Sequence, residues 1–361
     1  MCAARMAAWR VHAYGSCAEL RLESARVPAL RAPDDVLVRV RATSVNPLDV
    51  AMIGGYGARV LGAWRAADGA ADALPLVAGR DFSGTVARAG PAARLRRGAA
   101  VWGVVPPHRA GAHAQYVLVK DRWAGPAPRA LPPLQAGGAP FAALSACALL
   151  RAAGLAPGGA GARGARVLLL GLGGAGQAAL QLLAAAGARV LAGCARELRP
   201  LALRLGAAQA LDREAADYDA ALEDCGPYDA ILDCAGLGGA EAGARRWRFG
   251  RYATLSGPLL RRTDGAGLLA GALGAGADLL AHNVAARAPV RWAYFAPAPR
   301  DLELLRRRAE RGQFSVRVER VFGWWEADRA YEQLARGHAR GKLLLDFEAA
   351  RPAPHDEPPA R

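Results

Sequence analysis

Two different hydrophobic patterns follow each other along the 361-residue chain. Between residues 9 and 123, short β-branched runs are separated by turn residues, and valine recurs at every second position from Val36 to Val40. A period of two is typical of a strand with one exposed face. This part of the sequence therefore predicts an antiparallel β-rich domain.

The pattern changes between about residues 139 and 288. Apolar strand-like runs such as ARVLLLG, ARVLAGC and YDAILDCAG alternate there with helix-length Ala/Leu segments. Strands that alternate with helices indicate a parallel sheet with right-handed crossovers. We expect an α/β protein in which a doubly wound domain over 131–301 interrupts a β-rich domain formed by 6–130 and 302–348. The Pro-rich, polar end over 349–361 is expected to be disordered.

The clearest motif is a glycine-rich turn, GLGGAG, that follows an apolar run and opens a helix-like segment. This is the context in which a G-x-G-x-x-G motif binds a dinucleotide. The first glycine permits the tight turn, the second lets a pyrophosphate approach the backbone, and the third allows close packing of helix and strand. The alternative is a purely structural turn in an α/β sheet. The cofactor contacts expected of the motif are Gly171, Gly173, Gly174, Ala175 and Gly176.

The end of the next predicted strand indicates which dinucleotide is bound. NAD sites place Asp or Glu there for the ribose 2′-hydroxyl, whereas a 2′-phosphate favours arginine. Here Ala195 and Arg196 follow the strand, with no acid before Glu197. NADPH is therefore the expected cofactor, and Arg213 is a second candidate for contact with its phosphate. Arg196 could equally be a solvated residue at the start of a helix.

Charge and cysteine content argue against several other classes. The formal net charge is +15, but the arginines are spread along the chain and form no long basic block, so we expect no nucleic-acid partner. The six cysteines lie far apart, with no pair at the spacing of a zinc site and no secretory signal before them, which indicates reduced thiols. The uncharged stretch Val167–Ala188 fits a strand, turn and helix, and no transmembrane segment is predicted.

Several segments together carry a family resemblance: SVNPLDVAMIGGYG, GRDFSG, VWGVVPP, RWAYF and RGHARGK. In this order and spacing they resemble the zinc-free quinone-oxidoreductase branch of the medium-chain dehydrogenase/reductase superfamily, and most of all its mitochondrial, reticulon-interacting members. The resemblance implies that the first and last regions form one GroES-like catalytic domain, the middle region a Rossmann domain, and the cleft between them the cofactor site. It also implies a mitochondrial location, although no transit peptide is visible before Met6.

The resemblance also bears on metal binding. Zinc-dependent members of the superfamily carry a cysteine where this chain has Asn46, a His-Glu pair where it has Arg80 and Asp81, and a third ligand near Phe141. Without a thiolate or an imidazole at these positions, a tetrahedral zinc site cannot be assembled. We expect no metal site.

Without a Lewis acid, the plausible reaction is hydride transfer from NADPH to a quinone or a conjugated enone. The resemblance places Tyr56 on the substrate side, where its hydroxyl would stabilise a developing oxyanion or donate a proton. Asn46 and Asp49 would orient this tyrosine or the nicotinamide, and Ser145 would lie near the nicotinamide. The alternatives are turn chemistry at Asn46, packing at Tyr56, and a buried hydroxyl bonded to its own helix at Ser145.

Further cofactor contacts are implied by the resemblance alone. One group near the end of the chain combines an imidazole, a guanidinium and an ammonium, which could clamp phosphate oxygens, although a basic surface turn would have the same composition. The full set is Cys234, Gly236, Tyr252, Leu255, Ala293, Tyr294, Phe295, His338, Ala339, Arg340 and Lys342.

Two functions follow from these observations. The first is an NADPH-dependent oxidoreductase acting on a quinone or enone, which the resemblance connects with ubiquinone biosynthesis in mitochondria. The second is a nucleotide-binding interaction protein that binds a reticulon-type or other mitochondrial membrane protein with little turnover. The chain is expected to be a homodimer or a monomer, and the resemblance implies pairing through edge strands of the Rossmann sheet.

Overall fold

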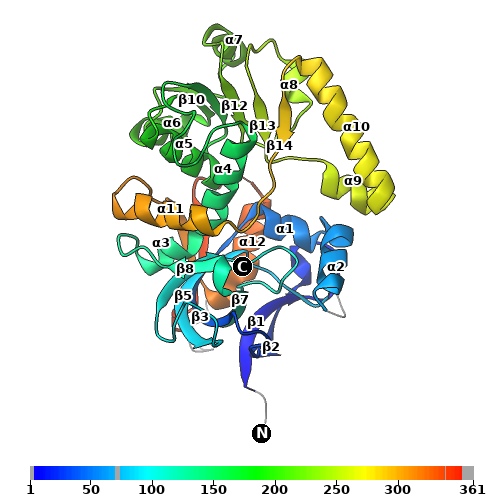
Figure 1. The fold of residues 1–361 in the computed structure, drawn as a ribbon, viewed down its shortest axis with the longest axis vertical. Helices are drawn as coiled ribbons and strands as arrows, with labels where there is room; N and C mark the ends of the chain where they lie inside the picture. Colours follow the sequence, from blue (N-terminus) through cyan, green and yellow to red (C-terminus); the bar gives the residue numbers. More distant parts are fainter. Residues whose placement is uncertain (1–3, 70–73, 338, 352–361) are drawn as a thin grey trace, which may run out of the picture.

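The computed structural model describes residues 4–69, 74–337 and 339–351. The chain forms a β-rich lobe and an α/β lobe, stacked along the long axis of the molecule (Figure 1). The expected α/β fold with a parallel Rossmann sheet is confirmed. His338 and residues 352–361 of the expected disordered tail lie outside the described part of the chain.

The β-rich lobe is built on a seven-stranded sheet to which both ends of the described chain contribute. Its strands, in spatial order, are β15 (Val318–Gly323), β16 (Lys342–Asp346), β3 (Asp35–Val45), β5 (Asp81–Ala89), β6 (Ala100–Val104) and β8 (Ala124–Pro126), with β7 (Tyr116–Lys120) paired to β3. A smaller sheet contains β2 (Leu20–Arg26), β1 (Arg5–Val11) and β4 (Leu76–Val77). All pairs are antiparallel except β15 with β16, which is parallel because helix α12 (Ala327–Ala335) connects them.

The α/β lobe contains a six-stranded parallel sheet. Its spatial order is β11 (Gln209–Asp212), β10 (Arg189–Cys194), β9 (Arg166–Leu170), β12 (Ala230–Asp233), β13 (Tyr252–Thr254) and β14 (Val290–Trp292). The chain reverses its direction of winding between β9 and β12, which is where doubly wound sheets bind ligands. The helices of this lobe are α5 (Gly174–Ala185), α6 (Arg199–Arg204), α7 (Tyr218–Asp224), α8 (Glu241–Ala244), α9 (Leu259–Ala266) and α10 (Leu268–Ala286).

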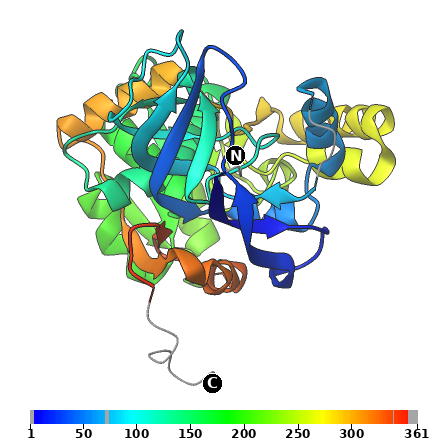
Figure 2. The ribbon, with the colours of Figure 1, turned by 90° about the horizontal axis from the view of Figure 1, so that it is seen from below.

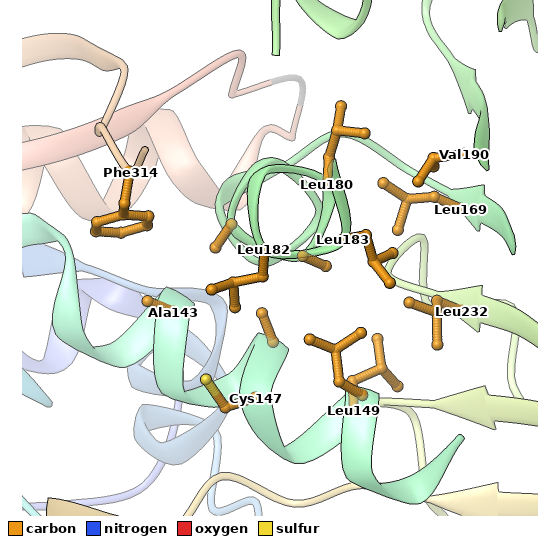
Figure 3. Packing of buried hydrophobic residues seen from close by; sticks show 14 of the residues in the cluster. Ala143, Cys147, Leu149, Leu169, Leu180, Leu182, Leu183, Val190, Leu232 and Phe314 are labelled. Atoms are coloured by element: carbon orange, nitrogen blue, oxygen red, sulfur yellow. The ribbon is translucent and has the colours of Figure 1, made fainter. Parts of the chain in front are cut away.

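The largest core lies where the lobes meet. Helix α5 packs beside α4 (Pro140–Ala152) and against strands β9 and β10, so that its leucines face both the neighbouring helix and the parallel sheet (Figure 3). Leu180, Leu182 and Leu183 are almost completely buried there. The uncharged stretch 167–188 is therefore a core strand, turn and helix, as predicted.

Helices outside the predicted pattern complete the lobes. The hydrophobic pattern did not predict helices α1 (Pro47–Ile53), α2 (Ala58–Ala67) and α3 (Pro133–Gly138), nor the pair α9 and α10. Helices α9 and α10 lie beside α2 on one side of the molecule (Figure 2). Helix α11 (Pro299–Glu310) carries three consecutive arginines, of which Arg306 and Arg307 bond to Glu303.

By length and composition alone, α10 could cross a membrane. Of its residues only Gly271 and Ala275 are buried, so most of its apolar residues lie outside the core. Its polar residues are nevertheless tied to the Rossmann lobe: Asp278 pairs with Arg262 of α9, and the Asn283 amide bonds to the backbone of Val290 in β14.

Candidate functional site

The glycine turn has the geometry that its sequence predicts. Gly171 has φ +89°, and a Cβ there would lie 2.9 Å from the Ala235 nitrogen. A Cβ at Gly176 would lie 2.1 Å from the Gly171 oxygen, so this glycine permits close packing of α5 on the turn. By contrast, a Cβ at Gly173 would meet nothing within 4 Å. The backbone is therefore open at the one position where a pyrophosphate was expected to approach.

The space next to this turn suits a phosphate. The first N–H groups of α5 have no acceptor within the helix, and the helix dipole makes this end positive. A small cleft adjoins the turn and is lined from both lobes, by Gly174 and Gln177 of α5, Ala142 of α4, and Arg317 and Lys342 of the catalytic lobe. The residues present therefore fit the phosphates of a dinucleotide.

Three arginines gather near the ends of β10 and β11, each with a carboxylate partner. The Arg196 side chain is 80% exposed, and its Nε donates to Asp212 at 2.8 Å. Arg213 lies 3.7 Å from Glu214, and Arg340 forms an ion pair with Glu197 across the cleft. The guanidinium groups were predicted, but the three carboxylates beside them were not. Ala195 is buried directly next to this group.

Four polar residues inside the β-rich lobe form a cluster at the inner end of the cleft. We call this set the buried polar cluster; its members are Ser44, Asn46, Asp81 and Lys342. The Lys342 ammonium donates to Asn46 Oδ1, and Asn46 Nδ2 lies 3.4 Å from Asp81 Oδ1. The Ser44 hydroxyl donates to Asp81 at 2.7 Å. Strand β16 brings Lys342 beside Ser44 and Asn46, which lie 298 and 296 residues away in sequence, because β16 pairs with β3.

Burial sets the protonation chemistry of the buried polar cluster. Burial lowers the pKa of Lys342 below that of an exposed lysine, although Asp81 and Asp49 oppose the shift. Burial likewise raises the pKa of Asp81, against the opposing effects of Lys342 and Ser44. Each shift favours the neutral form of its group, so the cluster can hold or release a proton closer to neutrality than free side chains would.

The positions at which the resemblance puts zinc ligands converge on this cluster. Asn46 and Asp81 are members, and the Phe141 N–H lies 3.4 Å from Asp81 Oδ2. No group of three or more His, Cys, Asp or Glu side chains is arranged for a metal among the described residues. The cation that Asn46 contacts in this structure is instead the Lys342 ammonium.

Asp49 has a structural position beneath the cluster. Its carboxylate accepts from the N–H groups of Asn46 and Gly79, both at 2.9 Å, and lies 3.4 Å from the buried Arg80 Nε. It thereby fixes the start of α1 to the loop before β5. Asp49 is thus a positioning residue, and its contacts are with this loop rather than with Tyr56.

A second buried pair was not found from the sequence. The His113 ring contacts the Ser44 carbonyl at 3.1 Å through Nε2 and the Tyr331 hydroxyl at 3.1 Å through Nδ1. Burial lowers the pKa of His113 and raises that of Tyr331, so both are expected to be neutral. An isolated His and Tyr, 218 residues apart, carry no sequence signal for this contact.

Tyr56 is half-buried in the glycine-rich loop between α1 and α2. Burial raises its pKa, with the Arg261 guanidinium opposing the shift, so the hydroxyl remains protonated near neutral pH. Tyr294, from the other lobe, is close enough for the two phenols to interact, and burial raises the pKa of Tyr294 to about 12. Phe295 packs on Phe141 with 4.5 Å between ring centroids.

A carboxylate of the Rossmann lobe holds this loop. Asp264 of α9 accepts from the N–H of Gly57 at 2.6 Å and from that of Arg59 at 3.1 Å. It therefore caps the N-terminus of α2 from the opposite lobe. The sequence gives no indication of this bond because its ends are 207 residues apart.

Three predicted contacts differ from expectation. Lys342 does not lie with Arg340 as a pair of phosphate contacts: Arg340 forms an ion pair with Glu197, whereas the Lys342 ammonium turns inward to Asn46. Tyr252 is a core residue whose hydroxyl donates to the Gly238 carbonyl. Ser145 donates to the Phe141 carbonyl at 2.8 Å, which is the bond to its own helix given above as the alternative.

The remaining predicted contacts lie around the end of the parallel sheet. Cys234 and Gly236 follow β12, in a loop whose backbone N–H groups donate hydrogen bonds to the carboxylate of the buried Asp233. Asp233 was missed because a lone Asp at a strand end has no distinctive pattern. Leu255 and Ala293 pack against the interlobe core, and Ala339 is half-exposed before β16.

Comparison with known families supports the two-lobe assignment. Residues 32–129 match the alcohol dehydrogenase GroES-like domain, and residues 205–345 match a family described as zinc-binding dehydrogenase. The second match covers part of the Rossmann lobe and the strands that return to the catalytic lobe.

Individual relatives agree over nearly the whole chain. The mitochondrial NAD(P)H oxidoreductase RTN4IP1 of Drosophila melanogaster is 37% identical over 355 residues, covering 94% of this chain and 86% of the relative. The mitochondrial reticulon-4-interacting protein 1 of Caenorhabditis elegans is 31% identical, covering 95% of each. Among solved structures, the quinone oxidoreductase from Coxiella burnetii superposes with a TM-score of 0.77 at 24% identity, covering 95% of this chain and all of the other.

Proposed function

Because the chain belongs to the medium-chain dehydrogenase/reductase superfamily and, within it, to the family of RTN4IP1 NAD(P)H oxidoreductases, we propose that it reduces a quinone or a conjugated enone with NADPH. The observation that carries the proposal is the buried polar cluster at the inner end of a cleft that begins at the open Gly173. A nicotinamide dinucleotide held on the glycine turn would supply the hydride, which carries both electrons of the reduction.

The chain's own residues would polarise the acceptor. The Lys342 ammonium lies next to Asn46 and Asp81, so its positive charge is placed inside the buried polar cluster. Its side chain passes beside Gly174, where a Cβ would lie 3.2 Å from Lys342 Cδ. A cation preorganised in a dry site stabilises a developing oxyanion more strongly than it would in water. We assign Lys342 this electrostatic role, with Asn46 as the group that positions its ammonium.

Tyr56 would act at the outer side of the acceptor. A hydroxyl that stays protonated can donate a hydrogen bond, or a proton, to the acceptor oxygen, on which negative charge develops when hydride adds to the conjugated system. Tyr294 and Phe295 would line the same space and exclude water from it.

Arginine at the end of β10 supports NADPH over NADH. Arg196 keeps most of its guanidinium exposed, and no carboxylate occupies the strand end before Glu197. A 2′-phosphate would compete with Asp212 for Arg196 and with Glu197 for Arg340, gaining charge-assisted hydrogen bonds from both. Arg213 would add to this positive field.

The relatives' printed names support a cellular setting. They describe mitochondrial proteins, and one describes a partner of reticulon-4. We assign this chain to mitochondria, with a reticulon-type membrane protein as a candidate partner. A quinone acceptor there would connect the reaction with ubiquinone biosynthesis, as the family resemblance suggests.

Oxidation of NADPH and NADH, followed by absorbance with short-chain quinones and enones, tests the proposal. We expect turnover with NADPH in excess of NADH, and a loss of about ten- to a hundredfold in kcat/KM for Tyr56→Phe, with NADPH affinity unchanged. Tyr116→Phe, which removes a hydroxyl from β7 in the β-rich lobe, is the matched control and should retain full activity. Binding of NADPH without oxidation by any acceptor would favour the interaction-protein alternative.

A further inference from the structure

Helix α10 is amphipathic in the opposite sense to an ordinary surface helix. All its exposed residues are Leu, Val, Ala or Gly, and none is polar. Its polar residues, Asp278, His282 and Asn283, lie instead on the half-buried side toward the rest of the lobe. Exposed apolar surfaces of this kind mark sites of association.

The large residues of this face form one narrow ridge. Leu269, Leu273, Leu280 and Val284 are 76%, 69%, 68% and 70% exposed. At 3.6 residues per turn they fall within an arc of about 60° around the helix axis. On both sides of the ridge the helix carries only alanine and glycine at exposed positions, apart from Leu268 at its start.

The ridge is symmetric along the helix. Leu269 and Val284 are equally distant from the point between Gly276 and Ala277, and so are Leu273 and Leu280. An identical helix placed antiparallel across this point would set Leu273 against Leu280 of the second copy and Leu269 against Val284. A surface that matches itself under a two-fold rotation is the requirement for an isologous dimer. The small residues at the centre would let the two backbones approach closely.

The sheet edge next to α10 is not free to pair in its place. Strand β14 is the outermost strand, and the backbone groups of Val290 point away from β13. The Asn283 side chain accepts from the Val290 N–H at 3.0 Å and donates to its carbonyl at 3.2 Å. The amide thus occupies the outward backbone bonds of Val290, which a further strand would need at that position. This differs from the edge-strand pairing that the family resemblance implies.

A membrane surface fits the same face less well. Helices that lie in a bilayer interface carry Lys or Arg along the polar border and Trp or Phe among the apolar residues. Helix α10 contains none of these four residue types, and its central Asp278 is paired with Arg262.

We propose that α10 is the contact surface of a homodimer, in which two copies pack this helix antiparallel about Gly276 and Ala277. The dimer is held by apolar contacts alone, so the absence of charge on the exposed face lets two chains of net charge +15 associate.

Sedimentation or light scattering of the purified full chain tests the interface. The wild-type chain should have twice the 37.6 kDa mass of one copy, and Leu273→Glu should reduce it to 37.6 kDa. Leu203→Glu is the matched control, because Leu203 is also exposed, at 52%, but lies on α6. Circular dichroism checks that each variant is folded. A monomeric wild type, or a Leu273→Glu chain that remains dimeric, overturns the proposal.

The register has a test of its own. In the antiparallel pair, Leu273→Glu combined with Leu280→Arg places opposite charges against each other across the two-fold axis and should restore the dimer. Leu273→Glu with Leu280→Glu should remain monomeric. Failure of the opposite-charge pair to restore association overturns this register. Co-sedimentation with vesicles of anionic phospholipid tests the lipid alternative. If the wild type is monomeric and sediments with the vesicles, and Leu273→Glu no longer does, the apolar face of α10 binds lipid instead.

Discussion

Lys342 shows how burial changes what one residue can do. Lys342 ends the basic segment RGHARGK, which suggested that it contacts a phosphate at the surface. In the structure its ammonium is buried against Asn46. A buried lysine has a lowered pKa and a low-dielectric surrounding, so its charge acts strongly on nearby groups. The position of one side chain thereby shifts the role that we propose for it from a contact with the cofactor phosphate to an electrostatic one at the acceptor.

The pKa of Lys342 leads to a pH prediction. Its ammonium is charged below the lowered pKa, so kcat/KM should fall as the pH rises through that value, earlier than for an ordinary lysine. Lys342→Met should lower kcat by about a hundredfold and remove this alkaline limb. The control is Lys120→Met, because Lys120 is the only other lysine in the sequence and pairs with Asp34 on the sheet. This variant should keep the wild-type kcat and the alkaline limb of the pH profile. An unchanged pH profile in Lys342→Met would exclude the electrostatic role.

At the scale of one element, Gly173 and Gly176 of the glycine turn should respond differently to substitution by alanine. A methyl group at Gly173 meets no protein atom, whereas one at Gly176 would collide with the Gly171 oxygen. Gly173→Ala should therefore leave the melting temperature unchanged and weaken NADPH binding by about tenfold, equivalent to about 1.4 kcal/mol. Gly176→Ala should destabilise the fold by about 1–3 kcal/mol. Calorimetric titration and thermal unfolding separate the two effects; equal NADPH affinity in Gly173→Ala and wild type would contradict the assigned phosphate position.

Element type was predictable where the local pattern was strong. The valine alternation around β3 and the apolar runs of β9, β10 and β12 correctly identify strands. The one exposed face that the alternation predicted for β3 is wrong, because the fold covers this strand along most of its length. The alternating segment FSVRVERVF, residues 314–322, also predicts a strand, but only its residues from Val318 onward form one. Before it, the N–H of Ser315 bonds to the Gln181 side chain of α5 at 2.8 Å instead of to a neighbouring strand. That contact comes from another lobe, so the local pattern could not reveal it.

At the scale of the whole molecule, Asp264 of the Rossmann lobe joins the two lobes through its bonds to Gly57 and Arg59, next to Tyr56. Its removal in Asp264→Ala leaves the first N–H groups of α2 without an acceptor, which should lower stability by about 0.5–2 kcal/mol. Because the same loop carries Tyr56, we also expect a higher KM for the acceptor with little change in NADPH affinity.

The control for this prediction lies on the neighbouring helix. Asp278→Ala removes a carboxylate that pairs with Arg262 within the Rossmann lobe and contacts nothing in α2. Thermal unfolding and steady-state kinetics on both variants compare a bond between lobes with one inside a lobe. An acceptor KM that rises equally in both would show that Asp264 has no particular effect on the cleft.

The sequence by itself determined the parallel sheet, the dinucleotide turn and the β-rich lobe, because each depends on residues close together in the chain. Glycine spacing, strand alternation and apolar runs act through backbone conformation and local burial. Only the tertiary structure decided that Lys342 meets Asn46, that His113 meets Tyr331, that Asp264 caps α2, and that α10 turns its apolar face outward. These contacts join residues far apart in sequence, or depend on which side of a helix the rest of the fold covers, and neither is encoded in a local pattern.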